Sequence, residues 1–344
     1  MRENTLNKAL RHASLKWLFA AAFVVAVFFS GLFSGLMNKA GLFYLVSGSV
    51  AAALMGFSGR EIGAAFRSAA GRPGPAAELK RAAHFWEAAA RNAWVLGVLG
   101  STLNFTIVLG GESGRIEDVG SRMIQAFIVS LYGLVLSVIC LVPALKIMGE
   151  IEGTGALETP AAAEISGAAS GRTFVYERVI GYILFAAVLG LTIYFLMKGR
   201  PQNGVLPMAK AVLHGPAILV IVGGTIAFAL FMNAGARALT LGFAMTGLIS
   251  LLMGFIQALF GFVHRSLQDI VSAIAFIISA GSFTLLGMLV VAAPLEDREV
   301  MEGRRKQPSS LSRMFWIVFP LLAFIFLVLT FIMVITPMKQ KVGG

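Results

Sequence analysis

The chain has 344 residues, of which 58% are hydrophobic and only 13% are charged, and its mean hydropathy is +0.83. A soluble domain carries about 25% charged residues, so this composition excludes an ordinary soluble protein and indicates one embedded in a membrane. The net charge is +11, and its Lys and Arg flank apolar runs, where they set membrane orientation, so we do not expect nucleic-acid binding. The single cysteine, Cys140, cannot form an internal disulfide.

Nine apolar runs are long enough to cross about 30 Å of hydrocarbon, which takes roughly 20 helical residues. Their unbroken apolarity predicts helices, because the strands of a membrane barrel would alternate. The predicted spans lie near 17–37, 42–57, 92–111, 122–145, 179–197, 215–233, 240–262, 270–293 and 314–337. We therefore expect an all-α polytopic membrane protein with nine transmembrane helices, the first of them retained rather than cleaved as a signal peptide.

The distribution of basic residues predicts the orientation. With the N-terminus inside, the inside segments hold 19 of the 28 Lys and Arg residues and the outside segments hold nine. This asymmetry predicts a cytoplasmic N-terminus and a C-terminus on the opposite side of the membrane.

Two stretches of the chain recur in the same order, which predicts an internal repeat. The matching segments are 45–54 with 221–230, and 117–121 with 268–272. The second segment of each copy is followed by a long apolar run that ends in a proline, Pro143 in one copy and Pro294 in the other. The offset is 176 residues for the first match and 151 for the second, because one polar loop is shorter in the second copy.

The repeat predicts the organisation of the whole chain. The first four-helix repeat covers 1–148 and contains a cytoplasmic loop at 58–91, and the second, degenerate repeat covers 177–298. A flexible linker at 149–176 joins them, and 299–344 adds a basic segment and a ninth helix. Because each repeat holds an even number of spans, both copies point the same way, which makes the repeat parallel.

The third and fourth predicted spans carry small residues and hydroxyls in a distinctive order. The third reads AWVLGVLGSTLNF over 93–105, and the fourth reads QAFIVSLYGLVLS over 125–137 and continues to Pro143. Ser101 and Ser130 lie nine and eight residues inside their spans, so both fall near the middle of the bilayer. Facing hydroxyls there could pass hydrogen bonds to water or a carboxyl group, or could simply cement a helix pair.

These runs resemble the MotA/TolQ/ExbB family of ion-driven motor subunits. That family has a Gly-x-x-Gly-Thr core on one motor span, then an Ala-Leu-x-x-Thr-x-Tyr/Phe-Gly run and a proline near the inner end of the next. The matching positions here are Gly97, Gly100, Ser101, Ala126, Ser130, Tyr132, Gly133 and Pro143. The resemblance covers most of the first repeat and, more weakly, the second.

The resemblance implies a subunit of a motor in the bacterial inner membrane, with a periplasmic C-terminus. It implies a homo-oligomeric ring around a single-span partner similar to MotB, ExbD or TolR, and H⁺ or Na⁺ as the transported ion, with no cofactor. The candidate ion-path residues are Ser101, Ser130, Thr102, Asn104 and Tyr132. The candidate helix-packing residues are Gly97, Gly100, Gly133, Ser137 and Pro143.

The chain departs from the family pattern in informative ways. Family threonines are Ser101 and Ser130 here, and the positions aligned with them in the second repeat are Leu251 and Gly281, which lack hydroxyls. The cytoplasmic loop is short, so we do not expect the chain to grip a rotor. No Asp, Glu, Lys, Arg or His lies in the middle of a predicted span, so in a motor subunit the titrating carboxylate has to come from another protein, which the resemblance identifies as the single-span partner.

Two other functions remain open on the sequence alone. A secondary transporter built from parallel repeats would need broken helices, charged residues at the midplane and a substrate cavity, and a non-conducting scaffold would need no ionisable groups there. We do not expect an enzyme, because no nucleophile–base pair is evident. We do not expect a metal site, because the four histidines are scattered without ligand spacing.

Overall fold

The structure is a computed structural model, which describes residues 39–71, 75–110, 116–153, 171–197, 215–232, 235–264, 267–301, 316–326 and 328–329. The chain divides into two compact parts, Met1–Lys39 and Ala40–Gly344. Lys39 is the one described residue of the first part, and all the other described residues belong to the second. The predicted first span and most of the predicted linker lie outside the described residues.

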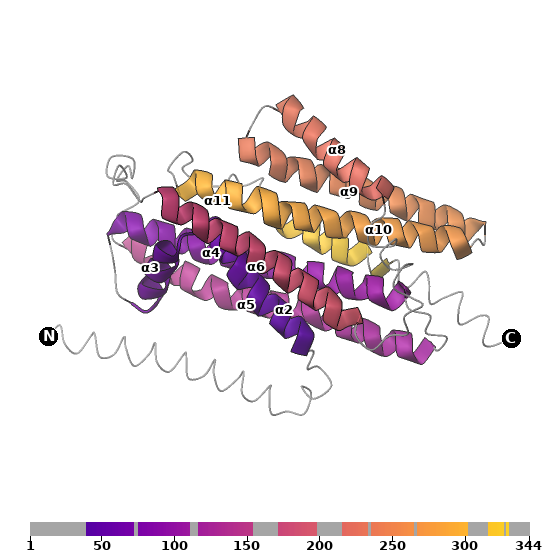
Figure 1. Ribbon diagram of the computed structural model, residues 1–344, viewed down its shortest axis with the longest axis horizontal. Helices are drawn as coiled ribbons and strands as arrows, with labels where there is room; N and C mark the ends of the chain where they lie inside the picture. The colour runs from indigo at the N-terminus through magenta and orange to yellow at the C-terminus, as the bar shows by residue number, and fades with distance from the viewer. Residues whose placement is uncertain are drawn as a thin grey trace. The chain divides into compact units, whose positions relative to one another are not determined.

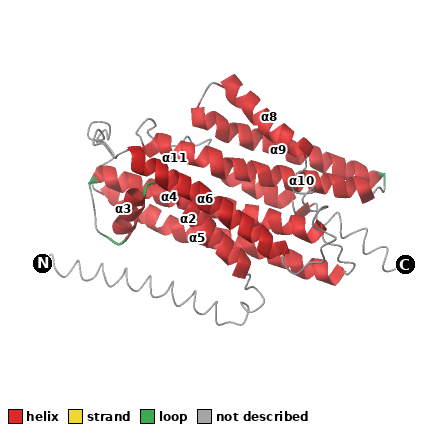
Figure 2. Cartoon of the chain, in the orientation of Figure 1, coloured by secondary structure: helices red, strands yellow, loops and turns green. Residues whose placement is uncertain are grey.

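Every regular element in the described ranges is a helix (Figure 2). The elements in chain order are α2 (Lys39–Gly56), α3 (Gly59–Ala69), α4 (Ala76–Gly110), α5 (Ile116–Gly153), α6 (Gly171–Met197), α8 (Gly215–Met232), α9 (Gly235–Val263), α10 (Leu267–Gly287), the π-helical η2 (Met288–Ala292) and α11 (Ala293–Met301) (Figure 1). A short apolar helix at Trp316–Phe326 follows, and we name it the C-terminal helix.

Four helical stretches in the described ranges are long and apolar enough to cross a membrane. They are Lys39–Gly56, Ala126–Ile151, Leu239–Val263 and Ser272–Met301. They confirm the predicted spans at 42–57, 122–145, 240–262 and 270–293, and they indicate a membrane-embedded helical protein. The other described spans stay predictions: two lie within the longer helices α4 and α6, and two coincide with the shorter apolar stretches Gly215–Ala227 and Trp316–Phe326.

Local sequence explains the break between α2 and α4. Ser58 caps α3: its hydroxyl accepts a hydrogen bond from the Glu61 amide, while the Glu61 carboxylate accepts from the Ser58 amide at 2.8 Å. Gly71, at φ +80°, takes a left-handed conformation after α3, and α4 begins after Pro75. The polar segment therefore forms a separate short helix before the long α4 starts.

Close backbone approaches hold the helices together. The most extensive contact is between the antiparallel helices α4 and α5, and α9 and α10 form a second antiparallel pair. Helix α10 also packs against α4 and α8. Helix α6 crosses α2 where a Cβ on Gly181 would lie 2.8 Å from the Met55 nitrogen, so only a glycine allows this approach.

The largest buried apolar cluster contains residues from both predicted repeats and from the C-terminal helix. It includes Leu45 of α2, Leu96 of α4, Leu251 of α9, Met288 of η2 and Phe319 of the C-terminal helix. The helices of the two predicted repeats therefore share one core. By contrast, α5 leaves a broad apolar face exposed, which consists of Leu131, Leu134, Val135, Val138, Ile139, Val142 and Leu145; such a face suits contact with lipid or with another membrane helix.

Candidate functional site

The two predicted ion-path serines face each other across the α4–α5 crossing. Ser101 Oγ lies 2.6 Å from Ser130 Oγ, and both residues are buried. Ser101 Oγ also donates to the Ala126 carbonyl at 2.6 Å and accepts from the Ser130 amide at 3.1 Å. Since each hydroxyl carries one proton, these distances fit a chain in which Ser130 donates to Ser101 and Ser101 donates to Ala126.

This hydroxyl pair sits beside the closest backbone contact of the pair of helices. A Cβ on Gly97 would lie 2.7 Å from the Cα of Gly133, and one on Gly133 would lie 2.8 Å from the Ala93 carbonyl oxygen. Gly100 faces the ring of Tyr44, where an added Cβ would lie 2.8 Å from Cε1. The three predicted packing glycines therefore lie at helix contacts that tolerate no side chain.

The other predicted ion-path residues do not gather around the serines. Thr102 points to the far side of α4, where its hydroxyl accepts from Ser282 of α10 at 3.1 Å and donates to the Leu99 carbonyl. Asn104 is half-buried and donates to the Gly100 carbonyl within its own helix at 2.8 Å. Tyr132 is half-buried and packs against the apolar core.

The last two predicted packing residues are less enclosed than the glycines. Ser137 and Pro143 are both half-buried in α5. Pro143 lies inside the helix, where it removes one backbone donor without ending the helix.

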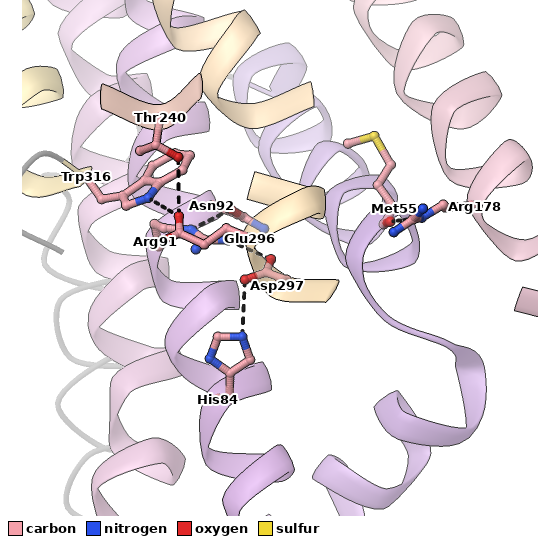
Figure 3. A network of polar contacts seen from close by, with 9 residues as sticks. All are labelled: Met55, His84, Arg91, Asn92, Arg178, Thr240, Glu296, Asp297 and Trp316. Carbon is pink, nitrogen blue, oxygen red and sulfur yellow. Dashed lines mark hydrogen bonds and ion pairs between the residues drawn. The ribbon is translucent and has the colours of Figure 1, made fainter. Parts of the chain in front are cut away.

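A second polar site, which the sequence did not predict, lies where α4 meets α11 (Figure 3). Asp297 is buried, and its Oδ2 accepts a charge-assisted hydrogen bond from Arg91 Nη2 at 2.7 Å. His84 Nε2 lies 3.3 Å from the other carboxylate oxygen, within ion-pair range but without hydrogen-bond alignment. Gly56 at the end of α2 makes room for this carboxylate, because a Cβ there would lie 3.2 Å from Oδ2.

The neighbouring carboxylate of Glu296 ties the C-terminal helix to the same site. Its Oε2 accepts from the indole N–H of Trp316 at 3.0 Å and lies 3.5 Å from the Thr240 hydroxyl. The Arg91 guanidinium stacks over the Trp316 ring, 4.5 Å from its centroid. Four helices, α4, α9, α11 and the C-terminal helix, thus meet around two buried carboxylates and one arginine.

The π-helical segment η2 leads into α11, which carries both carboxylates. Pro294 has no amide hydrogen, so it cannot donate to the Val290 carbonyl as an α-helix requires. The Ala293 amide bonds instead to the Met288 carbonyl, which makes the π turn, and the Tyr182 hydroxyl of α6 donates to Val290 at 3.2 Å. Helix α11 continues from this turn with Glu296 and Asp297 buried.

The sequence held one usable signal for this second site. The acidic pair 296–297 follows an apolar run within three residues, and Arg91 and His84 precede another apolar run. Charged residues this close to buried spans are costly unless they find partners. What the sequence could not supply was the pairing, since Arg91 and Asp297 are 206 residues apart.

Neither site has the make-up of a metal centre within the described part of the chain. No three His, Cys, Asp or Glu side chains there come together as metal ligands would. The hydroxyl pair can form and exchange hydrogen bonds, and the charged cluster can hold helix ends together. No protein-family model, curated protein or solved structure matches this chain.

Proposed function

We propose that this chain is a membrane subunit of an ion-driven motor, acting with a single-span partner that supplies the titrating carboxylate for H⁺ or Na⁺. The observation that carries the proposal is the Ser101–Ser130 hydroxyl pair at the tightest crossing of α4 and α5. Both serines are buried, and an apolar interior offers a moving ion few other hydrogen-bonding groups. The sequence resemblance to the motor family falls on the same two helices.

The proposal includes the internal repeat, and matched contacts support it. At an offset of 150 residues for α4 and 151 for α5, the close contact between Gly97 and Gly133 corresponds to one between Gly247 and Thr284. A Cβ on Gly247 would lie 2.5 Å from Thr284 Oγ1, so these two positions also meet at a close approach of their helix pair. The α4–α5 and α9–α10 crossings thus have the same register.

A second matched contact relates the preceding helices. A Cβ on Gly48 of α2 would lie 3.2 Å from Leu96 of α4. The aligned residues in the second repeat are Gly224 of α8 and Thr246 of α9, and a Cβ on Gly224 would lie 2.5 Å from Thr246. Agreement at both crossings supports a duplicated three-helix arrangement.

The second repeat lacks the hydroxyl pair at its matched position. The residues aligned with Ser101 and Ser130 are Leu251 and Gly281, and a Cβ on Gly281 would lie 3.9 Å from the leucine. The geometry is kept while the polar groups are gone. We therefore assign the ion path to the first repeat and a supporting role to the second, with a homo-oligomeric ring of chains as the expected assembly.

A non-conducting scaffold is the second candidate, and one observation favours it. The hydroxyl of Ser101 has a backbone acceptor within the chain, and Ser130 has Ser101 as its acceptor. Two serines whose hydrogen bonds are complete can serve helix packing alone. Conduction separates the two functions, because a scaffold passes no ions with any partner.

Ion flux of the native complex tests the proposal. The tagged chain is purified from its own membranes in mild detergent and reconstituted into vesicles with the single-span proteins that accompany it. H⁺ and Na⁺ flux is then measured with ion-sensitive dyes. We expect flux in the unaltered complex and a loss of about thirtyfold in the Ser101→Ala, Ser130→Ala double variant, since it loses two hydrogen bonds at about 1 kcal/mol each.

Two controls make the result specific. The Ser101→Thr variant keeps a hydroxyl and should keep most of the flux, while Ser68→Ala removes a buried hydroxyl of α3, outside the α4–α5 crossing, and should change nothing. Equal flux in the double variant and the unaltered complex would remove the serines from the ion path. No flux with any accompanying single-span protein would leave the scaffold as the function.

A further inference from the structure

The two predicted repeats meet directly on one side. Thr102 of α4 accepts a hydrogen bond from Ser282 of α10, and Phe105 of α4 packs in one buried cluster with Ile278 of α10. If the repeats were related by symmetry around a common axis, the aligned residues of α9 and α5 would make the same contact on the other side.

The C-terminal helix lies at that second position. The residue aligned with Phe105 is Phe255 of α9, and its ring packs edge-on against Phe326, with centroids 5.4 Å apart. The residue aligned with Ile278 is Phe127 of α5, which packs edge-on against Phe324 at 5.3 Å. The C-terminal helix thus contacts both the α9 position and the α5 position, whereas the aligned positions of α4 and α10 contact each other directly.

A buried hydroxyl beside this helix has no hydrogen-bond partner among the described residues. Thr284 of α10 is fully buried, and its Oγ1 makes no hydrogen bond within the described part of the chain. The Thr284 hydroxyl and the ring of Phe319 both lie against Gly247 of α9. A Cβ added at Gly247 would lie 2.7 Å from that ring. An unpaired buried hydroxyl costs about 1–3 kcal/mol, and the phenyl ring of Phe319 cannot accept its hydrogen bond as an oxygen would.

The C-terminal helix makes polar contacts at its first residue. The Trp316 indole donates to Glu296, and its ring stacks under Arg91. The contacts further along are aromatic, through Phe319, Phe324 and Phe326. Aromatic contacts within a membrane are readily replaced by those of another apolar helix, because lipid and side chains are equally apolar there. The Trp316 contacts are therefore the ones that hold this helix in place.

We propose that the surface formed by Phe127, Gly247 and Phe255 is the binding site for a single transmembrane helix of a partner. The chain's own C-terminal helix occupies it until that partner displaces it. The partner helix carries a carboxyl group at the level of Phe319, where the oxygen accepts the hydrogen bond of Thr284. The identification of the partner as the acid-bearing subunit of the motor rests on the proposed function. The binding of a helix to this surface does not depend on that function.

Exchange of the helix tests this site with the full chain. The probe is a synthetic peptide of residues 302–344 with p-benzoylphenylalanine at position 326, added to the chain in lipid nanodiscs and irradiated. We expect little cross-linked product with the unaltered chain and several-fold more with Trp316→Ala in the chain, mapped by mass spectrometry to α9 near Phe255. The same photoreactive residue at position 326 of the full chain serves as the positive control, and should cross-link internally to α9.

The chemistry of the bound helix is tested with two further peptides. A peptide with Phe319→Glu should compete about three- to tenfold better than one with Phe319→Leu, which is the effect of one hydrogen bond in a membrane. This advantage should disappear when the chain carries Thr284→Val. An advantage that persists in Thr284→Val would overturn the role of the hydroxyl.

The two proposals fail separately. Absence of any cross-link to α9 with the Trp316→Ala chain, when the internal control reacts, overturns the helix-binding site whether or not ions flow. Cross-linking to α9 in a chain that conducts no ions with any partner upholds the site and removes the motor function.

Discussion

Arg91 and Asp297 form an ion pair of 2.7 Å although 206 residues separate them. The pair joins α4 to α11 and thus fastens the first predicted repeat to the end of the second. Both side chains are largely enclosed, with 13% and 1% of their surfaces exposed. A buried ion pair of this kind matters for stability mainly because removing either residue leaves the other charge buried without a partner.

Removing one partner of this ion pair should be costly. Arg91→Leu leaves the Asp297 carboxylate buried beside only His84, and we expect a loss of about 3–5 kcal/mol in the free energy of unfolding. Replacing both, as Arg91→Leu with Asp297→Leu, should restore much of the stability because neither charge of the pair is then left buried without the other. Denaturant unfolding in mixed micelles, followed by circular dichroism, measures both. A double variant as unstable as the single one would show that the pair does more than balance charge.

The contact between Gly97 and Gly133 should tolerate no methyl group. Gly97→Ala places a Cβ 2.7 Å from backbone that cannot move aside without separating α4 from α5, and overpacking of this kind costs about 1–3 kcal/mol. Gly223→Ala is the matched control, since nothing lies within 4 Å of a Cβ there and alanine favours a helix by up to about 1 kcal/mol. Equal melting temperatures for the two variants would contradict the close crossing.

The sequence predicts these helices and their small-residue contacts because both depend on local pattern. Hydropathy locates four spans that the structure confirms, and the glycines at 97, 100 and 133 mark close approaches that follow from their lack of a side chain. The partners of Thr102 could not be predicted, because a helix turns its residues in all directions and only the packing of α10 shows which direction is occupied.

The π turn before α11 should depend on two residues. Tyr182→Phe removes the hydroxyl that donates to the Val290 carbonyl, and we expect a loss of about 1 kcal/mol in stability. Pro294→Ala restores the missing backbone donor, so the double variant with Tyr182→Phe should recover most of that loss. A double-mutant cycle of unfolding free energies measures the coupling, and simple additivity would disprove the link between them.

Trp316 makes both a hydrogen bond and a ring contact, and two substitutions distinguish their contributions. Trp316→Phe keeps a ring under Arg91 but loses the donor to Glu296, and should lower stability by about 1.5–3 kcal/mol. Trp316→Ala loses both and should also make the C-terminal helix more sensitive to limited proteolysis. If Trp316→Ala is no more sensitive to protease than Trp316→Phe, the ring contact contributes nothing to holding the helix.

The two sites differ in how far the sequence could reach them. The sequence places Ser101 and Ser130 at the same level because their depth in adjacent spans is set by the rise of a helix. The charged site could not be predicted, because its members come from separate helices whose order of packing no local pattern encodes. The place of the C-terminal helix could not be predicted for the same reason: its aromatic residues suit lipid and protein equally well.

The most direct test of the account is the structure, by electron cryo-microscopy, of the complex isolated from its own membranes. We expect an additional transmembrane helix bearing a carboxyl group to lie against Gly247 and Phe255 of α9, with that carboxyl near Thr284 and the C-terminal helix displaced. A complex in which the C-terminal helix keeps its place, and in which no foreign helix contacts α4, α5 or α9, would contradict the account.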